Sequence, residues 1–176
     1  LYNVGYFFEG GRLVTPDNDM TSDWGEYRPD LKLAIFNYNV HMVSPAPPQK
    51  ARTVLQSDTL YYYTETSVAN TRGPSTIDDG DSHIYTEYAY MNTNTNHLTL
   101  LQRSEMSSPG KKIIGDSIVW HSTDSVGEAF GNVIYTDIIN KNAMTGNYCY
   151  YNDKLGYTLG TDSSCVMDFS PGSASM

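Results

Sequence analysis

Histidines are the side chains best suited to hold a transition metal or to transfer protons near neutral pH. The chain has four of them, His41, His83, His97 and His121, and they are scattered along its length. No two have the spacing that would place them as metal ligands on one strand. The pattern therefore favours surface or turn histidines over a zinc site.

Two acidic runs have the composition of calcium loops, one from Asp17 to Asp23 and one from Asp78 to Asp81. Neither has the glycine at the sixth position and the glutamate at the twelfth that an EF-hand loop requires, so we interpret both as solvated turns. The chain also has no Gly-x-Ser-x-Gly, Walker or His-Glu-x-x-His motif. We therefore expect no catalytic residues, no metal and no cofactor, and a protein that is not an enzyme.

The composition is that of one folded, acidic domain. The 176 residues fit the usual domain size of ~100–200 residues. A formal net charge of −9 argues against binding to nucleic acid or to an anionic membrane by general electrostatics. Fifteen tyrosines argue against disorder. The sequence leaves open whether Cys149 and Cys165 form a disulfide or stay as two thiols.

The local pattern predicts strands rather than helices. Tyr, Thr, Asn, Ser and Gly dominate, and these residues form helices poorly. Runs rich in Tyr, Val, Ile and Thr alternate with Asn, Asp, Gly and Pro clusters that recur about every ten to fifteen residues. We expect an all-β chain of many short antiparallel strands, with under about a tenth of its residues helical.

A repeat of about 30 residues organises these strands. Its anchors are separated by 35, 29, 29 and 31 residues, and they are Asp23, Asp58, Glu87, Asp116 and Asn147. A small residue precedes each anchor, an apolar residue lies three positions before it, and a large residue lies four positions after it. Each unit reads as strand, tight turn, strand, and stacked units would share one core.

The apolar and large positions have opposite parity, so an unbroken strand would point them to opposite faces. A bulge or sharp bend at the small residue between them would return both to the interior. The acidic anchor would then face solvent or bond nearby backbone amides. We interpret it as structural rather than catalytic.

One stretch of the repeat resembles the OstA-like family, which includes the periplasmic lipopolysaccharide-transport protein LptA. Residues 113–133 carry IIGDSIVW followed by GEAFGNV, close to that family's apolar-Gly-Asp-aromatic and Ala-x-Gly-Asn-Val pattern. Residues 22–40 and 57–69 are further copies. The units of Glu87 and Asn147 depart from the pattern, because neither is followed by Gly-Asn-Val.

The resemblance implies an elongated, half-open antiparallel β-jelly-roll with a taco-like shape. Members of the family carry lipopolysaccharide across the Gram-negative periplasm to the outer membrane, with the acyl chains of lipid A in an apolar groove between two sheets. They dock head-to-tail on like domains. Under this reading the chain is periplasmic, and association with the outer membrane is left open.

The groove candidates are apolar repeat residues and their neighbours: Met20, Leu55, Leu60, Tyr62, Ile84, Met91, Ile113, Ile118, Trp120 and Met144. The same residues would serve equally as ordinary core. The alternatives are a structural or adhesive β-solenoid without lipid, and an enzyme or carbohydrate binder on a jelly-roll. Sheets that part along one edge would favour the lipid carrier.

We expect one domain over residues 1–176. Residues 1–11 resemble the second half of a repeat whose first half is missing, and residues 170–176 read as a tail of small polar residues. Both features predict a fragment of a longer stacked-β protein.

Overall fold

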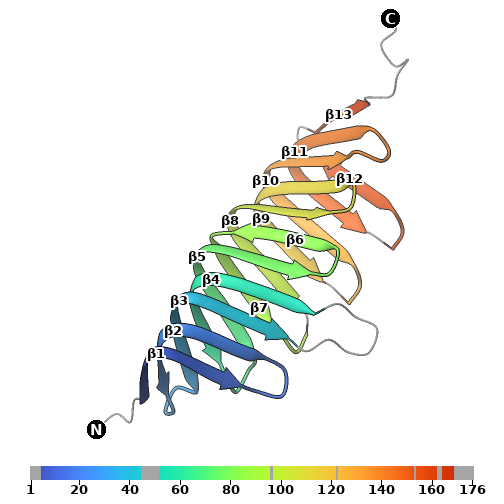
Figure 1. Ribbon diagram of the computed structural model, residues 1–176. Helices are drawn as coiled ribbons and strands as arrows, with labels where there is room; N and C mark the ends of the chain where they lie inside the picture. Colours follow the sequence, from blue (N-terminus) through green and yellow to red (C-terminus); the bar gives the residue numbers. More distant parts are fainter. Residues whose placement is uncertain are drawn as a thin grey trace, which may run out of the picture.

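The computed structural model describes residues 5–44, 52–95, 97–121, 123–152, 154–161 and 164–168. These residues form thirteen strands and no helix, which confirms the all-β prediction (Figure 1). Within these ranges no helix is long and apolar enough to cross a membrane. The expected tail at 170–176 and the first four residues of the expected half-repeat lie outside the described part.

The strands follow one another in chain order. Their bounds are β1 Gly5–Val14, β2 Asp19–Arg28, β3 Leu33–Ser44, β4 Thr53–Tyr63, β5 Val68–Asp79, β6 Ser82–Thr86, β7 Tyr88–Asn92, β8 His97–Ser108, β9 Lys111–His121, β10 Val126–Asp137, β11 Asn142–Asn152, β12 Tyr157–Thr161 and β13 Cys165–Asp168.

All thirteen strands belong to one antiparallel sheet, and most strands pair with the next strand along the chain. The short strands β6 and β7 together fill one place between β5 and β8, and β12 and β13 both pair with β11. The sheet is folded over on itself, so that each long strand crosses two layers (Figure 1). The first and last strands, β1 and β13, lie at opposite ends of an elongated molecule (Figure 1).

We call the two layers arms. The first arm contains residues 19–22 of β2, residues 53–57 of β4 and the residues paired with them on neighbouring strands. The second arm contains residues 24–28 of β2, residues 59–63 of β4 and the residues paired with those. The line where the sheet folds is called the bend. The edges opposite the bend, where chain turns connect the strands, are called the mouth.

Bulges create the bend. The register of β2 with β3 shifts between Thr21 and Trp24, and that of β4 with β5 shifts between Ser57 and Thr59. The predicted bulge beside the small residue of each unit is therefore present in these strands. In the third unit the strand is interrupted at Glu87, between β6 and β7.

Buried hydroxyl groups line the inside of the bend. The Oγ atoms of Ser57 and Ser75 are 2.9 Å apart, and Thr86 Oγ1 lies 2.8 Å from Ser104 Oγ. Ser57 also donates to the carbonyl of Thr59 at 3.0 Å. A bulge interrupts the regular backbone ladder, and buried carbonyl groups need other donors. The small hydroxyl residues of the repeat supply them.

A continuous apolar ladder crosses the first arm. Its members are buried and face one another from strand to strand: Met20, Met42, Leu55, Ile77, Ile84, Met106, Ile113, Tyr135 and Met144. The five residues that share an offset from the repeat anchors alternate here with residues of the return strands. The second arm faces this ladder with an inner row that includes Phe36, Leu60, Leu100, Ile118, Ala129 and Cys149.

Candidate functional site

The interior between the two arms brings the ten groove candidates together. Nine of them are buried, with exposed fractions from 0% to 9%, and Trp120 is partly buried against the same cluster. The first arm supplies Met20, Leu55, Ile84, Ile113 and Met144. The second arm supplies Leu60 and Ile118 near the bend, and Tyr62, Met91 and Trp120 nearer the mouth. All ten therefore face one apolar interior that runs along the molecule.

Sequence reasoning missed half of this interior. Phe36, Met42, Ile77 and Met106 contribute as much as the candidates do, but they lie on return strands. A signal existed in the repeat, because Met42, Ile77 and Met106 each lie 19 residues after an anchor. In β3 the buried run of residues 33–36 ends before the bulge between Asn37 and Val40, where burial resumes.

A buried asparagine joins the two arms at the mouth near the N-terminal end. Asn18 is only 1% exposed, in the turn between β1 and β2. Its Nδ2 donates to Tyr62 Oη at 3.3 Å and to Thr93 Oγ1 at 3.5 Å, both on the second arm. Its Oδ1 accepts from Ser44 Oγ of the first arm at 2.7 Å. Because a buried amide needs these partners, Asn18 ties the arms together.

A second contact crosses the mouth farther along. Lys111 Nζ of the first arm donates to Tyr151 Oη of the second at 3.5 Å and lies 5.3 Å from the centroid of its ring. A cavity of about 20 Å³ beside them is lined by Met106, Ile113, Tyr135 and other residues. Little open space is left between the arms here.

A larger hollow of about 420 Å³ lies elsewhere, on the outer face of the first arm near the bend. Its lining includes His41, Gln56, Thr76 and Tyr85, which alternate along their strands with the buried ladder residues. None of the ten candidates lines it.

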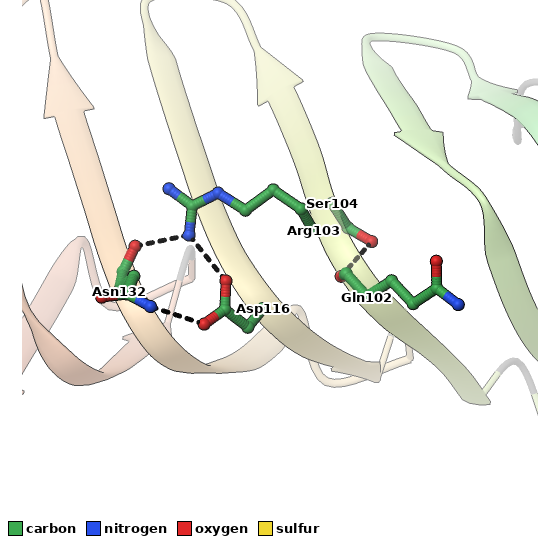
Figure 2. Close-up of polar contacts among 5 residues, drawn as sticks. All are labelled: Gln102, Arg103, Ser104, Asp116 and Asn132. Atoms are coloured by element: carbon green, nitrogen blue, oxygen red, sulfur yellow. Dashed lines mark hydrogen bonds and ion pairs between the residues drawn. The ribbon is translucent and has the colours of Figure 1, made fainter.

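The acidic anchors stabilise the bend from outside (Figure 2). Asp116 accepts a hydrogen bond from Asn132 Nδ2 at 2.7 Å and one from Arg103 Nη1 at 3.0 Å. Arg103 also donates to the backbone carbonyl of Asn132 at 2.7 Å. The hydrogen bonds from Asn132 and then Arg103 hold the pKa of Asp116 below its usual range. The same contact occurs in the first unit, where Asn39 Nδ2 donates to Asp23 Oδ2 at 2.5 Å.

This arrangement explains the spacing of the repeat motif. Gly131 has φ +71°, and a Cβ atom there would lie 2.7 Å from Asp116 Oδ2. The glycine lets the carboxylate approach, and the following asparagine binds it. The anchor faces solvent as expected, but its partners are the side chains of the neighbouring strands rather than backbone amides.

Two of the four histidines meet across neighbouring strands. His97 begins β8 and His121 ends β9, and their Nδ1 atoms are 3.1 Å apart. Burial, and secondarily His121, lower the pKa of His97. His83 is exposed and pairs with Asp78 at 2.5 Å. The scattered positions in the sequence thus gave no sign of the cross-strand pair.

The cysteines are two thiols rather than a disulfide. Cys149 is buried and Cys165 is exposed. Burial raises the pKa of the Cys149 thiol to about 11. In the part of the chain that the structure describes, no group of three or more His, Cys, Asp or Glu side chains is placed to hold a metal ion.

Comparison with known proteins supports the fold and the resemblance. Residues 1–48 match the family model of OstA-like proteins, which confirms the resemblance for that part of the chain. The structure is similar to the crystal structure of LptH, the LptA-homologous periplasmic component of the lipopolysaccharide transport device of Pseudomonas aeruginosa. The TM-score is 0.58 at 15% sequence identity, over 65% of this chain and 82% of that one. At this identity the likeness establishes the β-jelly-roll fold. The sequence matches no curated protein.

Proposed function

We propose that this OstA-like chain binds lipopolysaccharide and carries it across the periplasm to the outer membrane. The acyl chains of lipid A would lie between the two arms, against the ten groove candidates. The observation that carries the proposal is the apolar interior, which is continuous from Met20 to Met144 along one folded sheet. The match to OstA-like proteins and the likeness to LptH point to the same role. The chain would act as a carrier and not as an enzyme.

The interior has the chemistry that acyl chains need. Each methylene group of an acyl chain that is buried in an apolar site contributes about 0.8 kcal/mol to the free energy of binding. Five methionines, Met20, Met42, Met91, Met106 and Met144, lie in this core. Their flexible thioether side chains adapt to partners of irregular shape. A core rich in them can adapt its packing to acyl chains once the arms part.

Lipid entry requires the arms to part, because the structure has them packed together. The hydrogen bonds described across the mouth, from Asn18 to Tyr62 and Thr93 and from Lys111 to Tyr151, are 3.3–3.5 Å long. The bend side is held by the continuous strands themselves. The arms would therefore separate at the mouth while the bend stays intact. The burial of the groove candidates is also the observation that favours the alternative, a structural or adhesive β-solenoid.

A reversible cross-link at the mouth distinguishes the two functions. In a Cys165→Ser background, Asn18→Cys and Thr93→Cys place one thiol on each arm. A short bis-methanethiosulfonate linker joins them, and dithiothreitol releases them. Native mass spectrometry with purified lipopolysaccharide should show binding by the released protein and loss of binding by the linked protein.

The matched control places the same linker within one arm. Gln56→Cys and Thr76→Cys are neighbours in register on the outer face of the first arm. Linking them leaves the mouth free, and lipopolysaccharide binding should persist. Absence of binding by every released protein would contradict the carrier function and favour the β-solenoid. Binding by the protein linked at the mouth would contradict the site between the arms.

The partners we propose are like β-jelly-roll domains, including other copies of this chain, docked head-to-tail at the end strands. In the described part of the sheet, β1 pairs only with β2, and β12 and β13 pair only with β11. Their outer edges are therefore open to main-chain pairing with another strand.

A further inference from the structure

We propose that His97 and His121 form a clamp for a divalent transition-metal ion of the zinc class, on the outer face of the second arm at the mouth. The proposal is independent of lipid binding. It rests on the position of the two rings in the sheet, the distance between their nitrogens and the contact that orients one of them.

The sheet fixes the two histidines opposite each other. His97 and His121 are direct register partners on the antiparallel strands β8 and β9. Their inward neighbours Leu98 and Trp120 pack in the interior, so the imidazoles lie on the outer face. The ring centroids are 4.4 Å apart, with an angle of 61° between the ring planes. Only side-chain rotation is needed to adjust the pair.

The distance between the nitrogens suits a shared metal ion. The two Nδ1 atoms are 3.1 Å apart. Two imidazole nitrogens bound to zinc at about 2.0–2.1 Å lie roughly 3.3 Å apart when the angle is tetrahedral, and roughly 2.9 Å apart at a right angle. The observed separation falls between these values. A bound ion would replace the hydrogen bond that otherwise joins the rings.

Thr99 orients one ring for this role. Thr99 Oγ1 lies 3.2 Å from His97 Nε2, two residues along the same strand. A proton on Nε2 donated to this hydroxyl leaves the lone pair of Nδ1 directed at His121. Metal-binding histidines usually have such a contact on the nitrogen away from the ion.

The ligand set indicates which ions bind and how. Imidazole nitrogen suits Zn²⁺, Cu²⁺ and Ni²⁺ and does not suit Ca²⁺ or Mg²⁺. Since no third His, Cys, Asp or Glu joins the pair among the described residues, water would fill the remaining coordination positions. We therefore expect an exchangeable ion rather than a permanently held structural one.

Isothermal titration calorimetry with Zn²⁺ alone tests the clamp. The parent protein should bind one ion, and His97→Asn or His121→Asn should abolish that binding, because either change leaves a single imidazole. Thr99→Val should weaken it by roughly tenfold. The control, His41→Asn with His83→Asn, removes two histidines outside the clamp and should bind like the parent.

Nuclear magnetic resonance of histidine nitrogens supplies a second readout. Zn²⁺ should shift the Nδ1 resonances of His97 and His121 and leave those of His41 and His83 unchanged. Circular dichroism checks that each variant keeps its strands, and His97→Gln replaces His97→Asn if the latter does not fold. Zinc binding that survives the loss of either clamp histidine, or that disappears in the control, would overturn the proposal.

Discussion

At the scale of single residues, the clearest lesson is the part played by asparagine at the bend. Asn39 and Asn132 have φ values of 50° and 46°, in the left-handed region that most residues avoid. Asparagine tolerates this backbone better than other side chains with a Cβ atom. In addition, each donates its amide to the aspartate of the preceding strand. One residue thus satisfies both the backbone and the acidic anchor.

Replacing Asn132 separates these two contributions. Asn132→Ala loses the bond to Asp116 and places an unsuitable residue at positive φ, whereas Asn132→Gly loses only the bond. The left-handed backbone costs ordinary residues about 1–2 kcal/mol. Urea denaturation should show alanine lowering the free energy of unfolding by about 1 kcal/mol more than glycine. An alanine variant as stable as the glycine variant would show that the backbone at Asn132 carries no cost.

The residue types at the bend were predictable from the sequence, and their partners were not. The small Gly115 directly before Asp116 indicated a bulge and a solvent-facing carboxylate. Which asparagine reaches it depends on the register between β9 and β10. The same limit hid the pair formed by His97 and His121, whose contact arises from two strands belonging to different repeat units.

At the scale of elements, each long strand runs through both arms. The bulge between them shifts by one residue which alternate side chains point to the interior, so that both halves of the strand bury apolar residues. Met20, Leu55 and Ile113 could be assigned to one ladder from the sequence, since their offset from the anchors is constant. Their partners Met42 and Ile77 could have been assigned in the same way, since each lies 19 residues after its anchor, Asp23 or Asp58. The return strands bulge in different ways, with two residues at positive φ in β3 and only Gly73 in β5. These differences leave the offset of the ladder positions unchanged.

The ladder predicts different outcomes for two adjacent isoleucines of β9. Ile113 is 5% exposed in the ladder, while Ile114 points to the outer face. Ile113→Asp would bury an unpaired charge and should lower the free energy of unfolding by more than about 4 kcal/mol. Ile114→Asp should cost less, about 1–2 kcal/mol, because Ile114 is only half-buried, although the aspartate would lie in register with Glu105.

Thermal and urea denaturation measure both variants. If Ile113→Asp does not fold at all, Ile113→Ala replaces it and should cost about 2–5 kcal/mol. Similar melting temperatures for the aspartate variants at positions 113 and 114 would mean that the ladder is assigned to the wrong face.

At the scale of the whole molecule, the ends decide how the chain assembles. The outer edge of β1 is uncovered by any described strand, and Glu9 is its only charged residue before Arg12. Beside this edge Tyr6 and Phe8 are exposed and stack with each other, at 6.3 Å between ring centroids. Edges without lysine, proline or a covering loop tend to recruit another strand.

Sedimentation velocity over a concentration series tests this edge. The parent should self-associate, and Tyr6→Pro should associate less because proline cannot donate to a ladder. Tyr6→Ala is the control, since it removes the ring but keeps the backbone N–H. A parent that stays monomeric at high concentration, or a Tyr6→Pro variant that associates as strongly as the parent, would rule out pairing at β1.

The folded-over sheet also makes length and cross-section separate properties of this protein. The position of the bulge within each strand sets how wide the two arms are. The number of hairpins sets how long the molecule is, in steps of about 10 Å, because each hairpin adds two strand spacings. A duplicated hairpin would meet the same apolar ladder on both sides and would need no new core. Such a molecule can grow to span a given gap by copying one short segment of its gene.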